Sequence, residues 1–118
     1  MDIHAKRVYE PAEPHDGFRV LVDGVWPRGM TKERLHADLW LKDVAPSTAL
    51  RNWFHHDRSK WDTFRNRYFM ELDAKPQAVK RLLAEAREGR LTLLFSARDE
   101  ECNQAVALRE YLLSQCSI

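Results

Sequence analysis

The sequence predicts an α/β domain in which a mainly parallel sheet is flanked by helices. Apolar segments of strand length occur near the N-terminus and again at residues 91–97, and most of the sequence between them has helical spacing. A long helical connection between buried strands is typical of a right-handed parallel crossover. A chain of 118 residues with 44% hydrophobic composition can bury one core, so residues 1–118 are predicted to form a single domain.

Two short strands are predicted first, at residues 3–9 and 18–22, because both segments are rich in β-branched and aromatic residues. Pro11, Pro14 and Gly17 mark the loop between them. The second segment has apolar side chains on both faces, which is expected of a strand covered on both sides.

The next region is predicted to contain two capped helices around an irregular segment. Thr31 is placed to cap a short helix, and Ser47, which follows Pro46, is placed to cap a second one. Residues 39–44 fit either a third strand or an irregular edge segment, because charged residues interrupt their apolar pattern.

Two longer helices, a central strand and a final helix are predicted in the C-terminal half. Ser59 is expected to begin a helix with apolar residues three and four positions apart, and Pro76 and Gly89 are expected to begin and end the next one. The continuous apolar run at 91–97 indicates a strand buried on both faces. The last helix is predicted to run from about residue 101 to 114.

Composition argues against a charge-driven or membrane-embedded protein. Nineteen basic residues face eighteen acidic ones, so no overall field would attract nucleic acid or anionic lipid. No apolar run approaches the roughly 18 residues that a membrane span needs, and the N-terminus does not resemble a signal peptide. We expect no membrane association and a cytoplasmic location, with Cys102 and Cys116 reduced.

A ligand site is predicted where two strands end. Ligands of open α/β sheets bind outside the carboxyl ends of the strands, which brings residues 23–29 and 96–99 together. Arg28, Arg98 and the first amides of the last helix would then bind an anion, with Asp99 capping that helix and holding an arginine. The competing interpretation is an ion pair between Arg28 and either Asp23 or Asp99 that locks the two loops.

If catalysis occurs, the arginines would stabilise charge and an aspartate would orient a group or transfer a proton. The predicted catalytic residues are Asp23, Arg28 and Asp99. The predicted ligand-binding residues are Trp26, Gly29, Lys32, Arg98 and Asn103. No metal site is predicted and no cofactor is assigned.

Tryptophans and basic residues offer further binding hypotheses. Trp26 and Trp40 would provide a stacking surface for a ring, although Trp26 also fits a role in covering the sheet edge. Trp53 and Trp61 fall in helical apolar patterns typical of a core. Basic residues in the first two strands would extend a surface toward Arg28 that suits a nucleic-acid backbone; they are Lys6, Arg7 and Arg19.

Three other chemistries are considered and judged less favourable. His55, His56 and Asp57 carry metal-ligand and acid/base groups, but adjacent histidines point apart and a helix end explains them more simply. Ser96 lacks a nucleophile elbow, and Ser47 is explained as a helix cap. Cys102 is expected to be a buried, inert thiol, and these alternatives therefore add no predicted site.

Four blocks in this order, LVDGVWPRG, LWLKDVAPS, LRNWFHHD and TLLFSARDE followed by Asn103, resemble the YeaO-like family of bacterial proteins, domain-of-unknown-function family 488. The resemblance covers nearly the whole chain and implies its fold, but no particular activity. The family's first block usually resembles VDRLWPRG, so Gly24 stands where an arginine is expected. If that arginine helps to bind an anion in the family, this chain should bind the anion more weakly or supply a substitute such as Lys32 or Arg98.

A longer branch of the wider family looks to have a Cys-His-Arg motif after its last strand. Here that region reads Cys102-Asn103-Gln104, which lacks the histidine and the arginine and gives no support for thiol chemistry. The resulting hypothesis is a bacterial cytoplasmic protein that binds a small anionic ligand, such as a nucleotide or phosphorylated metabolite, at the strand carboxyl ends. Catalysis stays open. The alternative is a non-catalytic module that contacts a protein or nucleic acid through Trp26 and Trp40.

Overall fold

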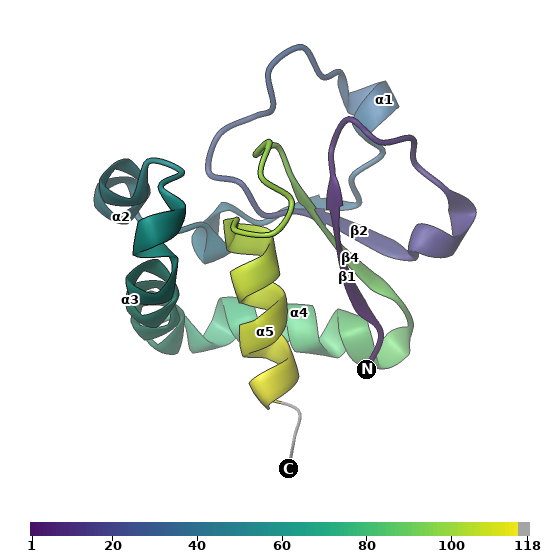
Figure 1. Ribbon diagram of the computed structural model, residues 1–118. Coiled ribbons are helices and arrows are strands. Elements are labelled where there is room, and N and C mark those ends of the chain that lie inside the picture. The colour runs from purple at the N-terminus through teal and green to yellow at the C-terminus, as the bar shows by residue number, and fades with distance from the viewer. Residues whose placement is uncertain (116–118) are drawn as a thin grey trace.

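The computed structural model describes residues 1–115 and confirms the α/β fold. Four parallel strands form one sheet in the order β1-β4-β2-β3 (Figure 1). Their bounds are β1 Ile3–Arg7, β2 Phe18–Leu21, β3 Leu39–Trp40 and β4 Leu91–Phe95. Both predicted N-terminal strands and the predicted central strand are therefore present, each shorter at its carboxyl end than expected.

Five α-helices and three short 3-10 turns connect the strands. The helices are α1 Lys32–Leu35, α2 Thr48–Phe54, α3 Trp61–Asp73, α4 Pro76–Glu88 and α5 Gln104–Gln115. The 3-10 turns are η1 Pro14–Asp16, η2 Lys42–Val44 and η3 Arg58–Lys60. No helix within residues 1–115 has both the length and the apolar character required to cross a bilayer.

The sheet is buried on both faces by different parts of the chain. In β4, Leu91, Leu93 and Phe95 pack into the main core, which also receives apolar side chains of α2 to α5. Leu94 points to the opposite face, where it joins a smaller cluster with Leu35 of α1. This alternation confirms that the run at 91–97 contains a central strand covered on both sides.

Local signals position most element boundaries. The Thr31 hydroxyl accepts a hydrogen bond from the Arg34 amide at 3.1 Å, and the Ser47 hydroxyl accepts one from the Leu50 amide at 3.1 Å. Both predicted caps are thus confirmed. Residues 39–44 form the short strand β3 followed by η2, which agrees with the irregular-edge alternative.

The starts of α3 and α5 differ from the prediction. The helix expected to begin at Ser59 begins at Trp61, because residues 58–60 form the 3-10 turn η3 instead. The Asp57 carboxylate caps this turn by accepting a hydrogen bond from the Ser59 amide at 3.0 Å. The last helix begins at Gln104 instead of about residue 101. Its first turn is capped by Asn103, whose side-chain oxygen accepts from the Val106 amide at 3.0 Å.

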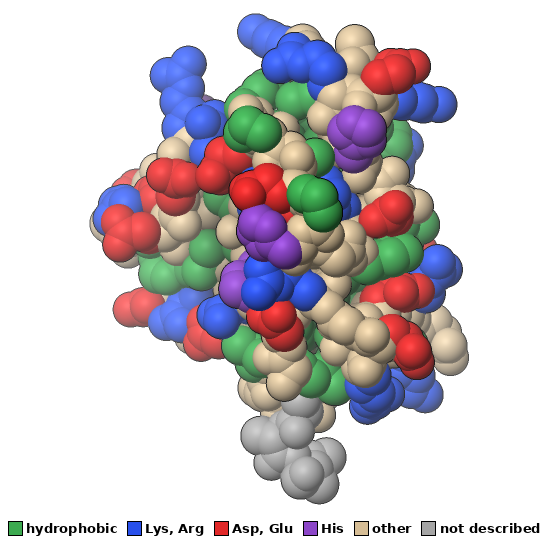
Figure 2. All heavy atoms as spheres, turned by 90° about the vertical axis from the view of Figure 1, so that its right-hand side faces the viewer, with side chains coloured by type: hydrophobic (Ala, Val, Ile, Leu, Met, Phe, Trp, Pro, Cys, Tyr) green, Lys and Arg blue, Asp and Glu red, His purple; other side chains and the backbone are tan. Residues whose placement is uncertain are grey.

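The basic surface predicted on the first strands does not form. The Arg19 guanidinium is buried and donates to Asp16 at 2.6 Å, and Lys6 donates to the same carboxylate at 3.0 Å. Arg7 donates through Nε to the Ala97 carbonyl at 3.0 Å. On the face that carries the loop between β1 and β2, acidic and basic side chains are interspersed (Figure 2). Lys6, Arg7 and Arg19 therefore stabilise the fold through their own hydrogen bonds.

Candidate functional site

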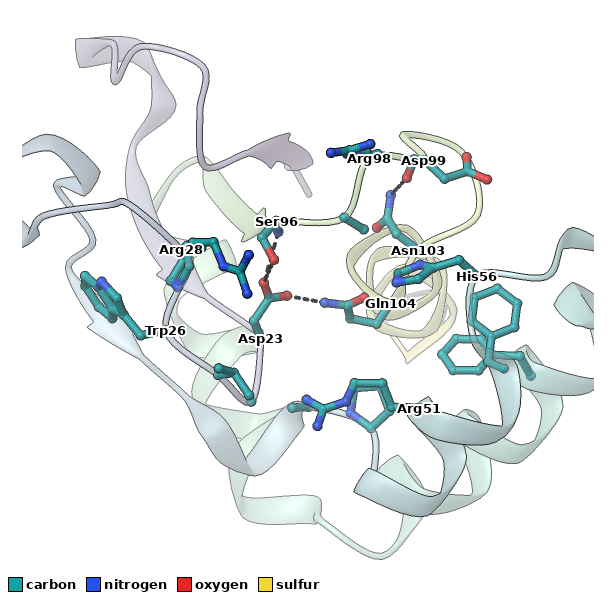
Figure 3. A pocket seen from close by; sticks show the side chains of 18 residues that line it. Asp23, Trp26, Arg28, Arg51, His56, Ser96, Arg98, Asp99, Asn103 and Gln104 are labelled. Carbon is teal, nitrogen blue, oxygen red and sulfur yellow. Dashed lines mark hydrogen bonds between the residues drawn. The ribbon is translucent and has the colours of Figure 1, made fainter.

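A cavity of about 690 Å³ lies at the carboxyl ends of β2 and β4 (Figure 3). Residues 23–28, which follow β2, and residues 96–99, which follow β4, both line it. The remaining walls come from residues 45 and 46, from α2 with His56, from Phe64, and from Asn103 and Gln104. The structure therefore brings together the two loops that the strand-end rule selects, and it adds a helical wall.

Asp23 lies at the centre of the cavity and is only 7% exposed. Its Oδ2 accepts hydrogen bonds from the Ser96 amide at 2.9 Å and the Ser96 hydroxyl at 2.6 Å. Its Oδ1 accepts from the Gln104 side-chain amide. Burial raises the pKa of Asp23 above its ordinary value, although these donors oppose the shift.

Arg28 is exposed and its guanidinium forms no hydrogen bond or ion pair with residues 1–115. The loop holds it through the backbone, because the Tyr9 hydroxyl donates to the Arg28 carbonyl at 2.9 Å. In Figure 3 the guanidinium extends toward Asp23 without bonding to it. The suggested ion pair between Arg28 and Asp23 or Asp99 is therefore wrong.

Two further arginines line the cavity, and neither forms an ion pair in the part of the chain that the structure describes. Arg98 is exposed, and within the described residues its guanidinium makes no ion pair. Arg51, on α2, likewise forms no ion pair within residues 1–115, but its charge acts on Asp23 and opposes the rise that burial causes in the pKa of that carboxyl. Sequence reasoning missed Arg51, because its contribution depends on where α2 packs.

Arg51 also corrects the expectation for Gly24. A β-carbon built on Gly24 would lie 3.7 Å from an Nη atom of Arg51, so the guanidinium occupies the space beside this glycine. Of the two substitutes suggested from the sequence, Lys32 lies on α1 and does not line the cavity, whereas Arg98 does line it. The positive charge nearest Gly24 thus comes from the helical wall.

Asp99 has a different role from the one predicted. The Arg58 guanidinium donates two hydrogen bonds to the Asp99 carboxylate, of 2.7 and 2.8 Å. Asp99 also accepts hydrogen bonds from the amides of Glu101 and Cys102 in the turn before α5. The contacts with Arg58 and, to a smaller extent, those with the two amides lower the pKa of Asp99 to about 2. It neither caps α5 nor holds Arg28 or Arg98, and so acidic a carboxyl is a poor proton acceptor.

The tryptophans at the site hold the loop together. Trp26 donates through Nε1 to the Met30 carbonyl at 2.7 Å, and its ring meets Trp40 edge-on with centroids 5.4 Å apart. Trp40 donates to the Asp23 carbonyl at 2.8 Å. Figure 3 shows the Trp26 ring directed away from Asp23, so the arrangement favours its covering role over ligand stacking.

Two other predicted ligand-binding residues have structural tasks. Gly29 does not line the cavity, and its φ of 73° lets the loop turn in a conformation that favours glycine. Asn103 lines the cavity but is 1% exposed, and its amide donates to the Asp99 carbonyl at 2.8 Å while its oxygen caps α5. Neither offers a free polar group to a ligand.

The histidine pair ends α2 as the helix-end interpretation predicts. His55 and His56 both have positive φ, of 45° and 55°, and only His56 lines the cavity. The Asp57 carboxylate accepts a hydrogen bond from the Ser59 hydroxyl at 2.7 Å. Within residues 1–115, the side chains that converge as metal ligands belong to another group, Glu13, His15 and Asp16, whose two carboxylates already contact Lys6.

The remaining nucleophile candidates are occupied or shielded. The Ser96 hydroxyl donates to Asp23, and the Ser47 hydroxyl, besides its capping role, donates to Glu71 at 2.6 Å. Cys102 is half-buried, and burial raises the pKa of its thiol, in agreement with an inert cysteine. Cys116 lies outside the described residues.

Comparisons with known proteins agree with the resemblance read from the sequence blocks. Residues 2–117 match a family model described as "Inactive DUF488-N3 subclade". The chain is 46% identical over 114 residues to the uncharacterized protein YeaO of Escherichia coli, which covers 97% of this chain and 99% of that relative. It is 49% identical over 70 residues to uncharacterized proteins of Mycobacterium tuberculosis and Mycobacterium bovis, or 59% of this chain and of each relative. No solved structure matches the chain at a significant level. The chain therefore belongs to the DUF488 family, within the subclade described as inactive DUF488-N3.

Proposed function

We propose that the cavity binds a small, multiply charged anion such as a phosphate group, without chemical turnover. The observation that carries this proposal is that three guanidinium groups line one cavity and form no ion pair within residues 1–115, those of Arg28, Arg51 and Arg98. Guanidinium groups that only stabilise a fold normally face carboxylates or carbonyls, as Arg19 and Arg58 do here. Unpaired guanidinium groups around a hollow instead suit the oxygens of an incoming anion.

The surrounding carboxylates leave this positive charge uncompensated. Asp99 lines the cavity but is neutralised by Arg58, and Asp23 contributes at most one negative charge against three positive ones. The hydrogen bonds that Asp23 accepts within residues 1–115 come from neutral donors of Ser96 and Gln104, and it forms no ion pair with the arginines there. A net positive field in a partly enclosed space raises the local concentration of anions.

Binding without turnover is favoured by the groups present and by the family description. Asp99 is too acidic to be a good base, and the Ser96 hydroxyl already donates to Asp23. The matching family is described as inactive. We also propose that the protein acts in the cytoplasm, where phosphorylated small molecules are made.

Isothermal titration with inorganic phosphate and pyrophosphate, at constant ionic strength against chloride, tests the proposal. Arg28→Gln, Arg51→Gln and Arg98→Gln should each weaken phosphate binding by roughly ten- to 100-fold, because a hydrogen bond to a charged group contributes about 1.5–3 kcal/mol. Arg87→Gln, at the exposed end of α4 and outside the cavity, is the matched control and should leave the affinity unchanged. Phosphate that does not bind, or that binds equally to all four variants, would overturn the proposal.

A further inference from the structure

The cavity has two chemically different sides. Arg28 lies on one side and His56 on the other in Figure 3, with Asp23 between them. Near His56 the wall is apolar: the Phe54 ring centroid is 6.3 Å from that of His56 and 4.3 Å from that of Phe64. Residues 45 and 46 continue this wall before α2. A fully ionic ligand such as free phosphate would leave this side unused.

The volume supports a ligand larger than an inorganic anion. A cavity of about 690 Å³ falls within the range of roughly 300–1,000 Å³ typical of sites for organic small molecules. Such sites combine apolar walls with a few polar groups that fix orientation. The polar side chains nearest His56 in Figure 3, Asn103 and Gln104, are already bonded to the Asp99 carbonyl and the Asp23 carboxylate. The exposed His56 ring, which packs on Phe54, therefore gives this side of the cavity a flat, accessible surface.

The charges select among anionic groups. Arg28, Arg51 and Arg98 together with an ionised Asp23 carry a net charge of about +2 when Asp99 is paired with Arg58. A phosphomonoester carries close to two negative charges above its second pKa of about 6, and therefore matches this charge. A sulfate ester or a phosphodiester carries one, and would leave one guanidinium without a counter-charge.

We propose that the ligand is a small phosphomonoester with a planar, apolar substituent, its phosphate held by Arg28 and Arg98 and its ring placed against His56 and the Phe54 wall. This inference rests on the proposed anion-binding function and names the class of ligand for the same site. The nearby Trp26 and Trp40 rings are not part of this surface, because they pack on one another beside the loop.

Four probes separate the two parts of the ligand: inorganic phosphate, methyl phosphate, phenyl phosphate and phenyl sulfate, titrated calorimetrically at pH 8. We expect phenyl phosphate to bind at least about tenfold more tightly than methyl phosphate, since only the phenyl ring reaches the apolar wall. We expect phenyl sulfate to bind at least about tenfold more weakly than phenyl phosphate, since it lacks one charge.

The matched variants His56→Asn and His55→Asn test the wall. Both positions have positive φ, which asparagine tolerates, but only His56 lines the cavity. His56→Asn should remove most of the preference for phenyl over methyl phosphate and leave methyl phosphate affinity unchanged, whereas His55→Asn should alter neither. Arg28→Gln should weaken both esters alike.

The outcomes distinguish the two proposals. If inorganic phosphate binds but the phenyl and methyl esters bind equally, or if His55→Asn and His56→Asn behave alike, the inference about the ligand is overturned and the anion site stands. If phosphate, both phosphate esters and the sulfate ester all fail to bind, both proposals are overturned.

Discussion

Replacing Asp23 with alanine should lower the free energy of unfolding by about 3 kcal/mol, because the change leaves three donors without their acceptor. The donors are the Ser96 amide, the Ser96 hydroxyl and the Gln104 side-chain amide. A hydrogen bond to a charged group contributes about 1.5–3 kcal/mol, but the hydroxyl and the Gln104 amide can turn toward water in the cavity and recover part of this. Removing a charge from a site that is 7% exposed returns a further part of the lost free energy.

Urea denaturation followed by tryptophan fluorescence at pH 7 measures this loss, and Asp23→Asn is its matched control. Asparagine keeps one oxygen for Ser96, and the Gln104 amide can turn its oxygen toward the new NH₂ group, so we expect a cost below about 1 kcal/mol. For a chain of 118 residues the alanine variant should melt about 12 °C lower than wild type. Equal losses in the two variants, or an alanine loss below about 1 kcal/mol, would refute the reasoning.

The pH dependence of the same pair has a definite sign. Because the pKa of Asp23 is raised in the folded state, the folded protein keeps this proton to higher pH than the unfolded chain. The contribution of Asp23 to stability is therefore largest below the unfolded pKa near 3.8 and declines as pH rises through the folded pKa. Wild type should gain stability relative to Asp23→Asn as the pH falls through this window, and a constant difference would contradict the assigned shift.

Two further changes test other parts of the structure. Arg58→Met should return the pKa of Asp99 from about 2 toward 3.8, as measured by NMR titration of its carboxyl carbon. Because the folded pKa of Asp99 is lowered, its contribution to stability is present above 3.8 and lost as pH falls toward 2, so wild type and variant should converge in stability over that range. Gly17→Ala should destabilise by at least about 2 kcal/mol, because φ is 69° and the new β-carbon would lie 2.2 Å from the Arg90 carbonyl oxygen. Gly89→Ala, where the backbone is extended and the space is open, should be neutral or slightly stabilising, and similar losses in both glycine variants would contradict this account.

The fold could be predicted because its determinants are mostly local in sequence. The apolar run that forms β4 and the caps at Thr31 and Ser47 act over a few residues, and each is found where the sequence places it. The errors fall where a tertiary contact competes with a local signal. The Asp99 side chain is of a type that caps helices, but Arg58 binds it, and Asn103 caps α5 instead.

The candidate site could be predicted in outline for a topological reason. Strands that run parallel must end at the same edge of the sheet, so the loops containing Arg28 and Arg98 had to meet. The pairing of charges there could not be predicted, because Arg58 and Asp99 are 41 positions apart and nothing in the sequence couples them. Gln104, which bonds to Asp23, was missed because the two residues are 81 positions apart and only the packing of α5 against the sheet brings them together.

Gly24 and Arg51 are neighbours in the structure, so a positive charge lies beside the position where the sequence resemblance leads one to expect an arginine. A β-carbon at Gly24 would make ordinary contacts with Ala45 at 3.5 Å and Arg51 at 3.7 Å, but a longer side chain would have to displace the Arg51 guanidinium. Glycine in the loop and arginine on α2 are therefore parts of one arrangement. Because α2 also carries Phe54 and ends beside His56, Arg51 and the apolar wall lie on the same rigid element. A ligand with both an anionic and a planar group can then contact α2 through both parts, which is the geometry that the phosphomonoester proposal requires.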